Sequence, residues 1–176
     1  MKKILLIAGF LGLFAGANAQ SIIDKLFDKY SGAEGITTVY ISKYMFDMFR
    51  SDEATGQSEE DINKIMSKLN CIKIIATDDD PATPVPVNLY QEIMKVLPST
   101  AAYKEMMVVK EKDQDIKFMA KESKGKVIEL LLIVNGKESN VLISIQGEDI
   151  DMKNISKLAK GMNIEGMENL DKIEEK

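Results

Sequence analysis

A chain of 176 residues, 45% of them hydrophobic, is long enough to form one domain with a buried core. Its formal net charge is −5, which argues against nucleic acid or an anionic membrane as the partner, because both need a clustered basic surface. The sequence contains no histidine, so the commonest general base and the commonest zinc ligand are absent.

The first 19 residues are typical of a secretory signal peptide. Two lysines precede an apolar run over residues 4–14, and Ala-Asn-Ala at residues 17–19 fits a cleavage site. The apolar run is 11 residues long, well short of the roughly 20 that span a bilayer. We expect cleavage between Ala19 and Gln20, and a mature, soluble chain in the periplasm or outside the cell. An uncleaved N-terminal anchor is the alternative.

Removing the leader makes the chain more acidic. The mature chain would carry 21 basic residues against 28 acidic ones, a formal net charge of −7. Gln20 follows the cleavage point, where a lipid-anchored protein would have cysteine, so we expect no stable membrane insertion or tethering after cleavage. The sequence thus predicts a single domain over residues 20–160 and an acidic tail over residues 161–176, which either frays or forms a loosely attached helix.

Helical and extended patterns alternate through the first half of the mature chain. Ser42 can cap a short helix in which Met45, Met48 and Phe49 share a face. Ser58 resembles the start of a capping box. The expected elements are a helix over 21–30, a strand over 36–41, a helix after Ser42, a helix over 58–69, a strand over 71–77 and a helix over 87–97.

The second half is rich in strands. Short charged turns separate extended patterns over residues 104–110, 115–120, 126–134 and 140–146. Sequential neighbours at this spacing usually pair antiparallel, so a four-strand meander is expected. After it, Asp151 can cap a helix over residues 152–160 that ends at Gly161. Ile150 and Ile155 stand at the two positions of a hydrophobic staple for that helix.

The hairpin over residues 126–146 is the expected centre of the sheet. A loop that opens on Asn135-Gly136 joins two runs of β-branched and leucine residues, which is a strong hairpin signal. Ile128, Leu130, Leu132 and Val134 form one apolar face of the first strand, and Val127, Glu129, Leu131 and Ile133 form a nearly apolar second face. A strand that is apolar on both faces belongs inside the sheet, under cover on both sides. The predicted fold is therefore α+β, with five to six mostly antiparallel strands covered by helices.

Few residues suggest chemistry. Asp78 to Asp80 could hold Ca²⁺, but the spacing of an EF-hand is missing and a solvated acidic loop is the favoured interpretation. Glu148, Asp149 and Asp151 fit helix capping better than metal binding. Cys71 begins an apolar strand, which favours a buried small hydrophobe over a reactive thiol or a dimer bridge. Serine and lysine side chains have plainer roles as caps, turns or solvated surface. We assign no catalytic, cofactor-binding or metal-binding residue.

Three stretches of the chain resemble an exported bacterial family, the domain of unknown function 4252. They are Phe27–Tyr30 (FDKY), Gly35–Phe46 (GITTVYISKYMF) and the hairpin with Gly147–Asp151 (GEDID) after it. The resemblance covers most of residues 21–160 and lies in apolar and glycine positions. It implies a signal sequence, an envelope or secreted location, an α+β fold and no assigned activity. Members often carry a lipid-anchor cysteine at the cleavage point, where this chain has Gln20.

We therefore expect an exported, non-enzymatic domain of the bacterial envelope that binds a protein or a small ligand. Two alternatives remain open. One is a cryptic hydrolase that uses carboxylates or a Ser–Lys pair, for which a cleft with two or more converging ionisable groups would be the distinguishing feature. The other is a structural or adhesive module that Ca²⁺ stabilises.

Overall fold

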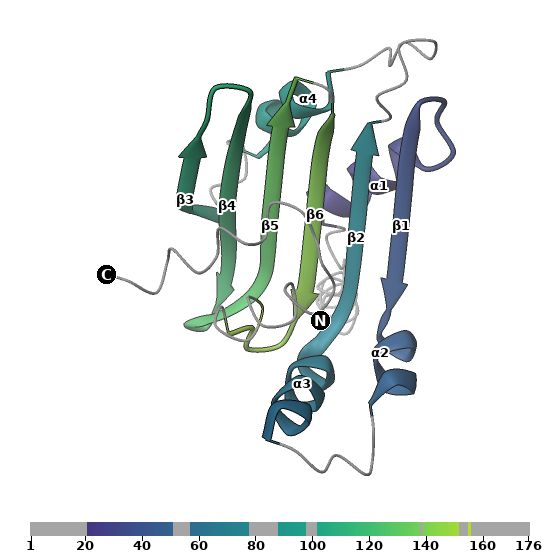
Figure 1. Ribbon diagram of the computed structural model, residues 1–176, viewed down its shortest axis with the longest axis vertical. Coiled ribbons are helices and arrows are strands. Elements are labelled where there is room, and N and C mark those ends of the chain that lie inside the picture. The colour runs from purple at the N-terminus through teal and green to yellow at the C-terminus, as the bar shows by residue number, and fades with distance from the viewer. Residues whose placement is uncertain are drawn as a thin grey trace, which may run out of the picture.

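The computed structural model describes residues 21–50, 57–77, 88–97, 102–137, 139–151 and 155, with residues 57–59 described by their backbone alone. Within these ranges the chain forms four helices and six strands (Figure 1). The helices are α1 (Ile22–Tyr30), α2 (Lys43–Phe49), α3 (Gln57–Lys68) and α4 (Leu89–Val96). The strands are β1 (Ile36–Ser42), β2 (Leu69–Thr77), β3 (Tyr103–Lys110), β4 (Gln114–Ser123), β5 (Lys126–Gly136) and β6 (Asn140–Gly147).

All six strands belong to one antiparallel sheet in the order β1-β2-β6-β5-β4-β3. The α+β prediction is confirmed, and so is the four-strand meander, because β3, β4, β5 and β6 pair in sequence. The β5–β6 hairpin occupies the two central positions, as its two apolar faces indicate. The non-local step is the pairing of β2 with β6, which joins the first half of the chain to the hairpin.

Each face of the sheet carries its own apolar cluster. On one face, Ile23 of α1 and Ile93 of α4 pack with Leu131, Ile133 and other residues of the central strands. Figure 1 shows α1 and α4 behind the sheet and α2 and α3 beyond its lower end. On the other face, residues of α2 and α3 pack with a second set from the strands, together with Ile150 and Ile155. Burial of each large apolar side chain contributes roughly 1.5–3 kcal/mol. Because β5 has buried residues in both clusters, it stabilises the packing on both faces of the sheet.

The first helices begin and pack differently from one another. Ser21 caps α1, because its Oγ accepts a hydrogen bond from the Ile23 amide at 3.3 Å. Ser42 stands at the cap position of α2 but makes no side-chain capping bond, so the predicted cap is wrong in that respect. The predicted apolar face of α2 is exposed: Met45, Met48 and Phe49 face outward, and Phe46 is the buried residue of this helix.

The remaining expectations lie partly outside the described residues. The leader, the loop with Asp78 to Asp80, the Ser58 side chain and the acidic tail all fall there, as does most of the expected helix over 152–160. Of that last region, the Ile155 amide donates to the Asp151 carbonyl at 3.1 Å, and Ile150 and Ile155 are buried in the same cluster. No helix in the described part of the chain is long and apolar enough to cross a membrane.

Candidate functional site

A row of side chains with polar groups crosses all six strands at one level of the sheet. Directly opposed residues in a sheet project from the same face, so the pairing registers place these side chains side by side. The row meets the described residues of α1 through Gln146 and lies on the face that α1 and α4 cover. From β1 to β3 it consists of Ser42, Cys71, Gln146, Glu129, Lys121 and Tyr103, and we call it the polar row.

Glu129 is the centre of the polar row and is only 3% exposed. Its Oε2 accepts a hydrogen bond from the Tyr103 hydroxyl at 2.8 Å. Its Oε1 accepts from the Ser144 hydroxyl at 2.8 Å and from Gln146 Nε2 at 3.3 Å. A buried carboxylate is costly unless donors satisfy it, and here three donors do so, one from β3 and two from β6. Burial, reinforced by the Glu129 charge, raises the pKa of Tyr103, so this phenol stays protonated and remains a donor.

Asp24 of α1 forms the second polar centre on this face. Lys73 of β2 donates a hydrogen bond to Asp24 Oδ1, and both side chains are mostly shielded from solvent. Burial alone would lower the pKa of Lys73, but the hydrogen bond and the charge of Asp24 outweigh it and the pKa is raised. Gln146 Nε2 lies 3.5 Å from the same Asp24 oxygen, which connects this centre to Glu129. The network therefore ties the first turn of α1 to three central strands.

Lys73 and Ser144 are directly opposed residues on β2 and β6. The interpretation of serines and lysines as caps, turns and solvated surface is wrong for these two, because Ser144 is fully buried and only 14% of the Lys73 side chain is exposed. Their hydrogen bonds nevertheless go to two different carboxylates. A nucleophilic serine needs a neutral base beside it and an open path to substrate. Lys73 is held as the ammonium, and Ser144 is closed off from solvent.

Cys71 is buried, as its place in an apolar strand predicts, with 7% of its surface exposed. Its Sγ lies 3.5 Å from Gln146 Oε1, which gives the thiol one polar neighbour. Burial raises the pKa of Cys71, although the positive charge of Lys73 acts in the opposite sense. A thiol whose pKa is raised carries little thiolate at neutral pH, and the thiolate is the reactive form.

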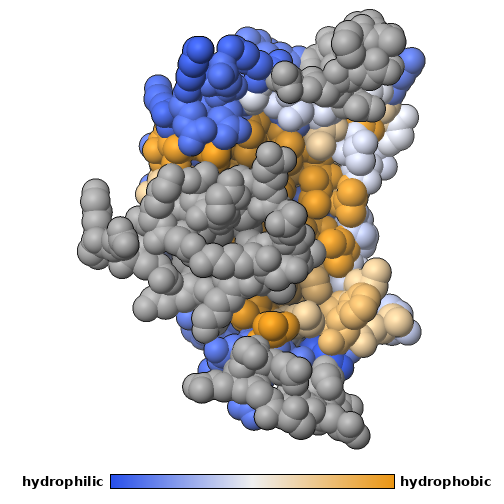
Figure 2. Space-filling model, in the orientation of Figure 1, coloured by the Kyte–Doolittle hydropathy of each residue, from blue (hydrophilic) through white to orange (hydrophobic). Residues whose placement is uncertain are grey.

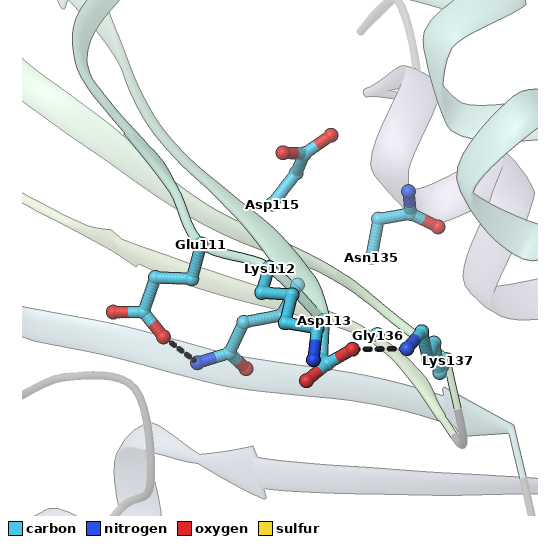
Figure 3. A pocket seen from close by; sticks show the side chains of 8 residues that line it. Glu111, Lys112, Asp113, Asp115, Asn135, Gly136 and Lys137 are labelled. Atoms are coloured by element: carbon cyan, nitrogen blue, oxygen red, sulfur yellow. Dashed lines mark hydrogen bonds and ion pairs between the residues drawn. The ribbon is translucent and has the colours of Figure 1, made fainter.

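An open hollow of about 210 Å³ lies where the β3–β4 turn meets the end of β5, and none of the polar row lines it. Figure 3 shows that its side chains pair with one another: Asp113 points toward Lys137, with which it forms an ion pair. Gln114 Nε2 also donates to Glu111 at 3.0 Å. Small-molecule sites are usually about 300–1,000 Å³ and mostly enclosed, so this hollow is a weak candidate for one. A second cavity, between α3 and Ile150, measures only about 10 Å³.

The acidic group after β6 serves a structural role. Asp149 lies 3.4 Å from Lys68 Nζ and 3.5 Å from Lys126 Nζ, and these two cations lower the pKa of its carboxyl. Within the described ranges, no group of three histidine, cysteine or acidic side chains could hold a metal ion. The other acidic candidate, Asp78 to Asp80, lies outside those ranges. Ala19 and Gln20, at the expected cleavage point, do so too.

An exposed apolar surface covers the outward side of α2. Tyr44 and Phe49 are 73% and 68% exposed, and two methionines between them are also largely in solvent. Figure 2 shows apolar side chains at the lower right of the molecule, where α2 lies in Figure 1. We call Tyr44, Met45, Met48 and Phe49 the α2 patch. The sequence contained a signal for it: an apolar run too crowded for one buried face on a helix of seven residues.

A family model described as "Domain of unknown function (DUF4252)" matches residues 30–158. Neither a curated protein nor a solved structure matches the chain. The matched range contains all six strands and α2, so both the polar row and the α2 patch lie within it.

Proposed function

This chain belongs to the family described as Domain of unknown function (DUF4252), and we propose that it is an exported, non-enzymatic domain that binds another protein in the bacterial envelope. The α2 patch is the observation that carries this proposal. Isolated exposed apolar residues are ordinary on protein surfaces, whereas a contiguous group of them marks a contact surface. Four such side chains on one short helix, directly after the edge strand β1, form such a group.

The arrangement of the ionisable groups supports a non-enzymatic role. Carboxylates, a lysine, a serine and a thiol do converge on the α1 face of the sheet, which is the pattern that a cryptic hydrolase would need. Their hydrogen bonds, however, go to one another, and the pKa shifts of Lys73 and Cys71 hold both groups in their less reactive forms. We therefore assign this network to holding α1 on the sheet.

Export is supported by the leader sequence, with its two lysines, its apolar run and its Ala-Asn-Ala site. Intact-mass measurement of the protein recovered from the producing cells tests it. We expect a chain that begins at Gln20. A mass that corresponds to a chain beginning at Met1 would contradict export with cleavage.

Protein binding is tested with a photo-cross-linking amino acid placed at Met48, in the centre of the α2 patch. Expressed in its native envelope, the Met48 variant should give a cross-linked protein product. The matched control carries the same probe at Lys112, an exposed residue of the β3–β4 turn that lies outside the patch. Phe49→Ser, added to the Met48 variant, should lower the yield several-fold. Equal yields from the two probe positions, or none from Met48, would count against the proposal.

The non-enzymatic part has its own test. The purified protein is screened against ester, peptide and glycoside substrates, with Ser144→Ala as the comparison. We expect no turnover. Turnover that disappears in Ser144→Ala would show that the buried hydroxyl becomes accessible and reacts.

A further inference from the structure

The outer edge of β1 is the most open backbone surface of the sheet. β1 is the last strand on its side, and it pairs with β2 over its whole length, from Ile36 opposite Thr77 to Ser42 opposite Cys71, without a bulge. In the described part of the chain no other strand pairs with its outer side. An edge of this kind leaves amide and carbonyl groups free, and such groups form a template for another strand.

β1 lacks the features that usually protect an edge strand. Its seven residues include no charge and no proline, and Val39 and Tyr40 are exposed. The opposite edge differs: β3 carries Lys104, Glu105 and Lys110, and a bulge interrupts its pairing between Glu105 and Met107. Charged side chains and bulges are devices that discourage edge-to-edge pairing. The two edges of the sheet thus differ in their protection, and β1 is the edge that is open to pairing with another strand.

We propose that β1 pairs antiparallel with β1 of a second copy of this chain, about a twofold axis at Val39. This inference rests on the proposed function, protein binding. It identifies a second copy of this chain as a protein that binds at the β1 edge, next to the α2 patch. An axis at Val39 keeps all seven residues of both strands paired, with Thr37 opposite Ile41 and Thr38 opposite Tyr40. Opposed residues then share a face, so the two α1 layers lie on the same side of one continuous sheet.

The charges at the ends of β1 favour this occupant over an unrelated strand. Glu34 lies just before the strand and Lys43 just after it, and both are exposed. With the axis at Val39, Glu34 of each copy falls opposite Tyr44 of the other, one position beyond Lys43, so opposite charges lie near each other at both ends of the joined strands. Lys43 Nζ also lies 3.3 Å from the Ser67 carbonyl of its own chain. No like charges oppose each other between these ends, because the strand itself is uncharged. Like charges directly opposed across a strand pair are destabilising.

The size of the contact sets the expected strength. A seven-residue strand alone offers less than the roughly 800 Å² per partner of a standard stable interface. We therefore expect a reversible dimer, populated as protein concentration rises through the micromolar range.

Sedimentation velocity on the purified exported chain is the first test. We expect the mass to move from the monomer toward twice that value with concentration, and Val39→Lys to abolish the shift by opposing two lysines at the axis. The matched control is Met106→Lys on β3, because Met106 is 41% exposed and Val39 is 38% exposed. Met106→Lys should dimerise like the parent. A parent that stays monomeric, or a control that fails as Val39→Lys does, would overturn the proposal.

Two further variants test the register and remain informative if Val39→Lys folds poorly. Mixing Val39→Lys with Val39→Glu should restore a dimer that neither forms alone, because the two side chains meet only at the axis. Val39→Cys should give a disulfide-linked dimer on mild oxidation, since directly opposed Cβ atoms lie about 4.5–5.5 Å apart. Met106→Cys should not. Failure of both the mixture and the cross-link overturns the axis at Val39. A protein that stays monomeric but still cross-links to a different protein from Met48 overturns this inference and leaves the proposed function standing.

Discussion

Glu129 shows how one carboxylate can organise the face of a sheet. It lies on a strand whose other residues are almost all apolar, and its two oxygens accept from Tyr103, Ser144 and Gln146. Each of these donors is itself partly or fully buried. Removing the carboxylate would leave three donors without this acceptor in a region largely shielded from water, and that penalty exceeds the value of any single hydrogen bond.

Glu129→Ala should therefore lower the free energy of unfolding by about 1–3 kcal/mol, the cost of leaving buried donors without an acceptor. The matched control is Glu122→Ala on β4, whose carboxylate pairs with Lys104 in solvent and should change stability by less than about 1 kcal/mol. Urea unfolding followed by circular dichroism measures both. Similar losses of unfolding free energy in the two variants would show that the buried hydrogen bonds of Glu129 contribute no more to stability than an exposed ion pair does.

The Cys71 thiol gives a pH-dependent prediction. Its folded pKa lies above the unfolded value because of burial. A group of this kind contributes stability that is fully present below the unfolded pKa and is lost as the pH rises through the folded pKa. Between pH 8 and pH 10 the parent should thus lose more stability than Cys71→Ala, measured by urea titration at each pH.

Reaction of Cys71 with a disulfide reagent at pH 8 should also be at least about tenfold slower in the folded protein than in urea. Equal rates in the two states would contradict the assigned burial.

At the scale of elements, local signals were sufficient for most of the fold. The Asn135-Gly136 loop and the two apolar faces of its first strand predicted the central hairpin, and short turns predicted the meander, because both depend on neighbours in sequence. The polar row depends on the register of β2 against β6, which places Cys71 opposite Gln146, 75 residues away in the chain. No local pattern contains that register. A partial signal existed in β6, where Ser144 and Gln146 occupy one face of an otherwise apolar strand.

The junction between α3 and the end of β6 depends on Gly147. A Cβ atom at this position would lie 2.4 Å from the Lys68 carbonyl oxygen, which also accepts the Glu148 amide at 2.8 Å. Because both contacts involve backbone, neither can move aside cheaply. Gly147→Ala should lower the free energy of unfolding by about 1–3 kcal/mol, the usual range for overpacking. Glu148→Ala, on the exposed neighbour, should stay within about 0.5 kcal/mol. Thermal melts of the two variants would decide, and equal midpoints would exclude the clash.

At the scale of the whole molecule, the sheet has an apolar layer on both faces, and β5 belongs to both. Leu130 and Leu132 face one cluster, and Leu131 and Ile133 face the other. This arrangement explains why the apolar content of the hairpin is so high. It also makes the stability of both clusters depend on the buried residues of β5.

Leu130→Asp should accordingly cost more than about 4 kcal/mol, because it buries a carboxylate with no donor provided for it. We expect loss of the cooperative melting transition. Met106→Asp on the exposed edge strand β3 is the control, and it should melt close to the parent. A Leu130→Asp protein that melts normally would mean that water reaches that face of β5.

The protected edge at β3 has a consequence for how far association can proceed. Because its bulge and its charged residues discourage a further strand, two molecules that join through β1 would present only guarded edges to the outside. The assembly would then be isologous and closed, with growth ending at the pair rather than continuing into a filament. A sheet with one open edge strand and one protected edge strand would in this way allow two copies to pair while limiting the risk of cross-β polymerisation in a crowded envelope.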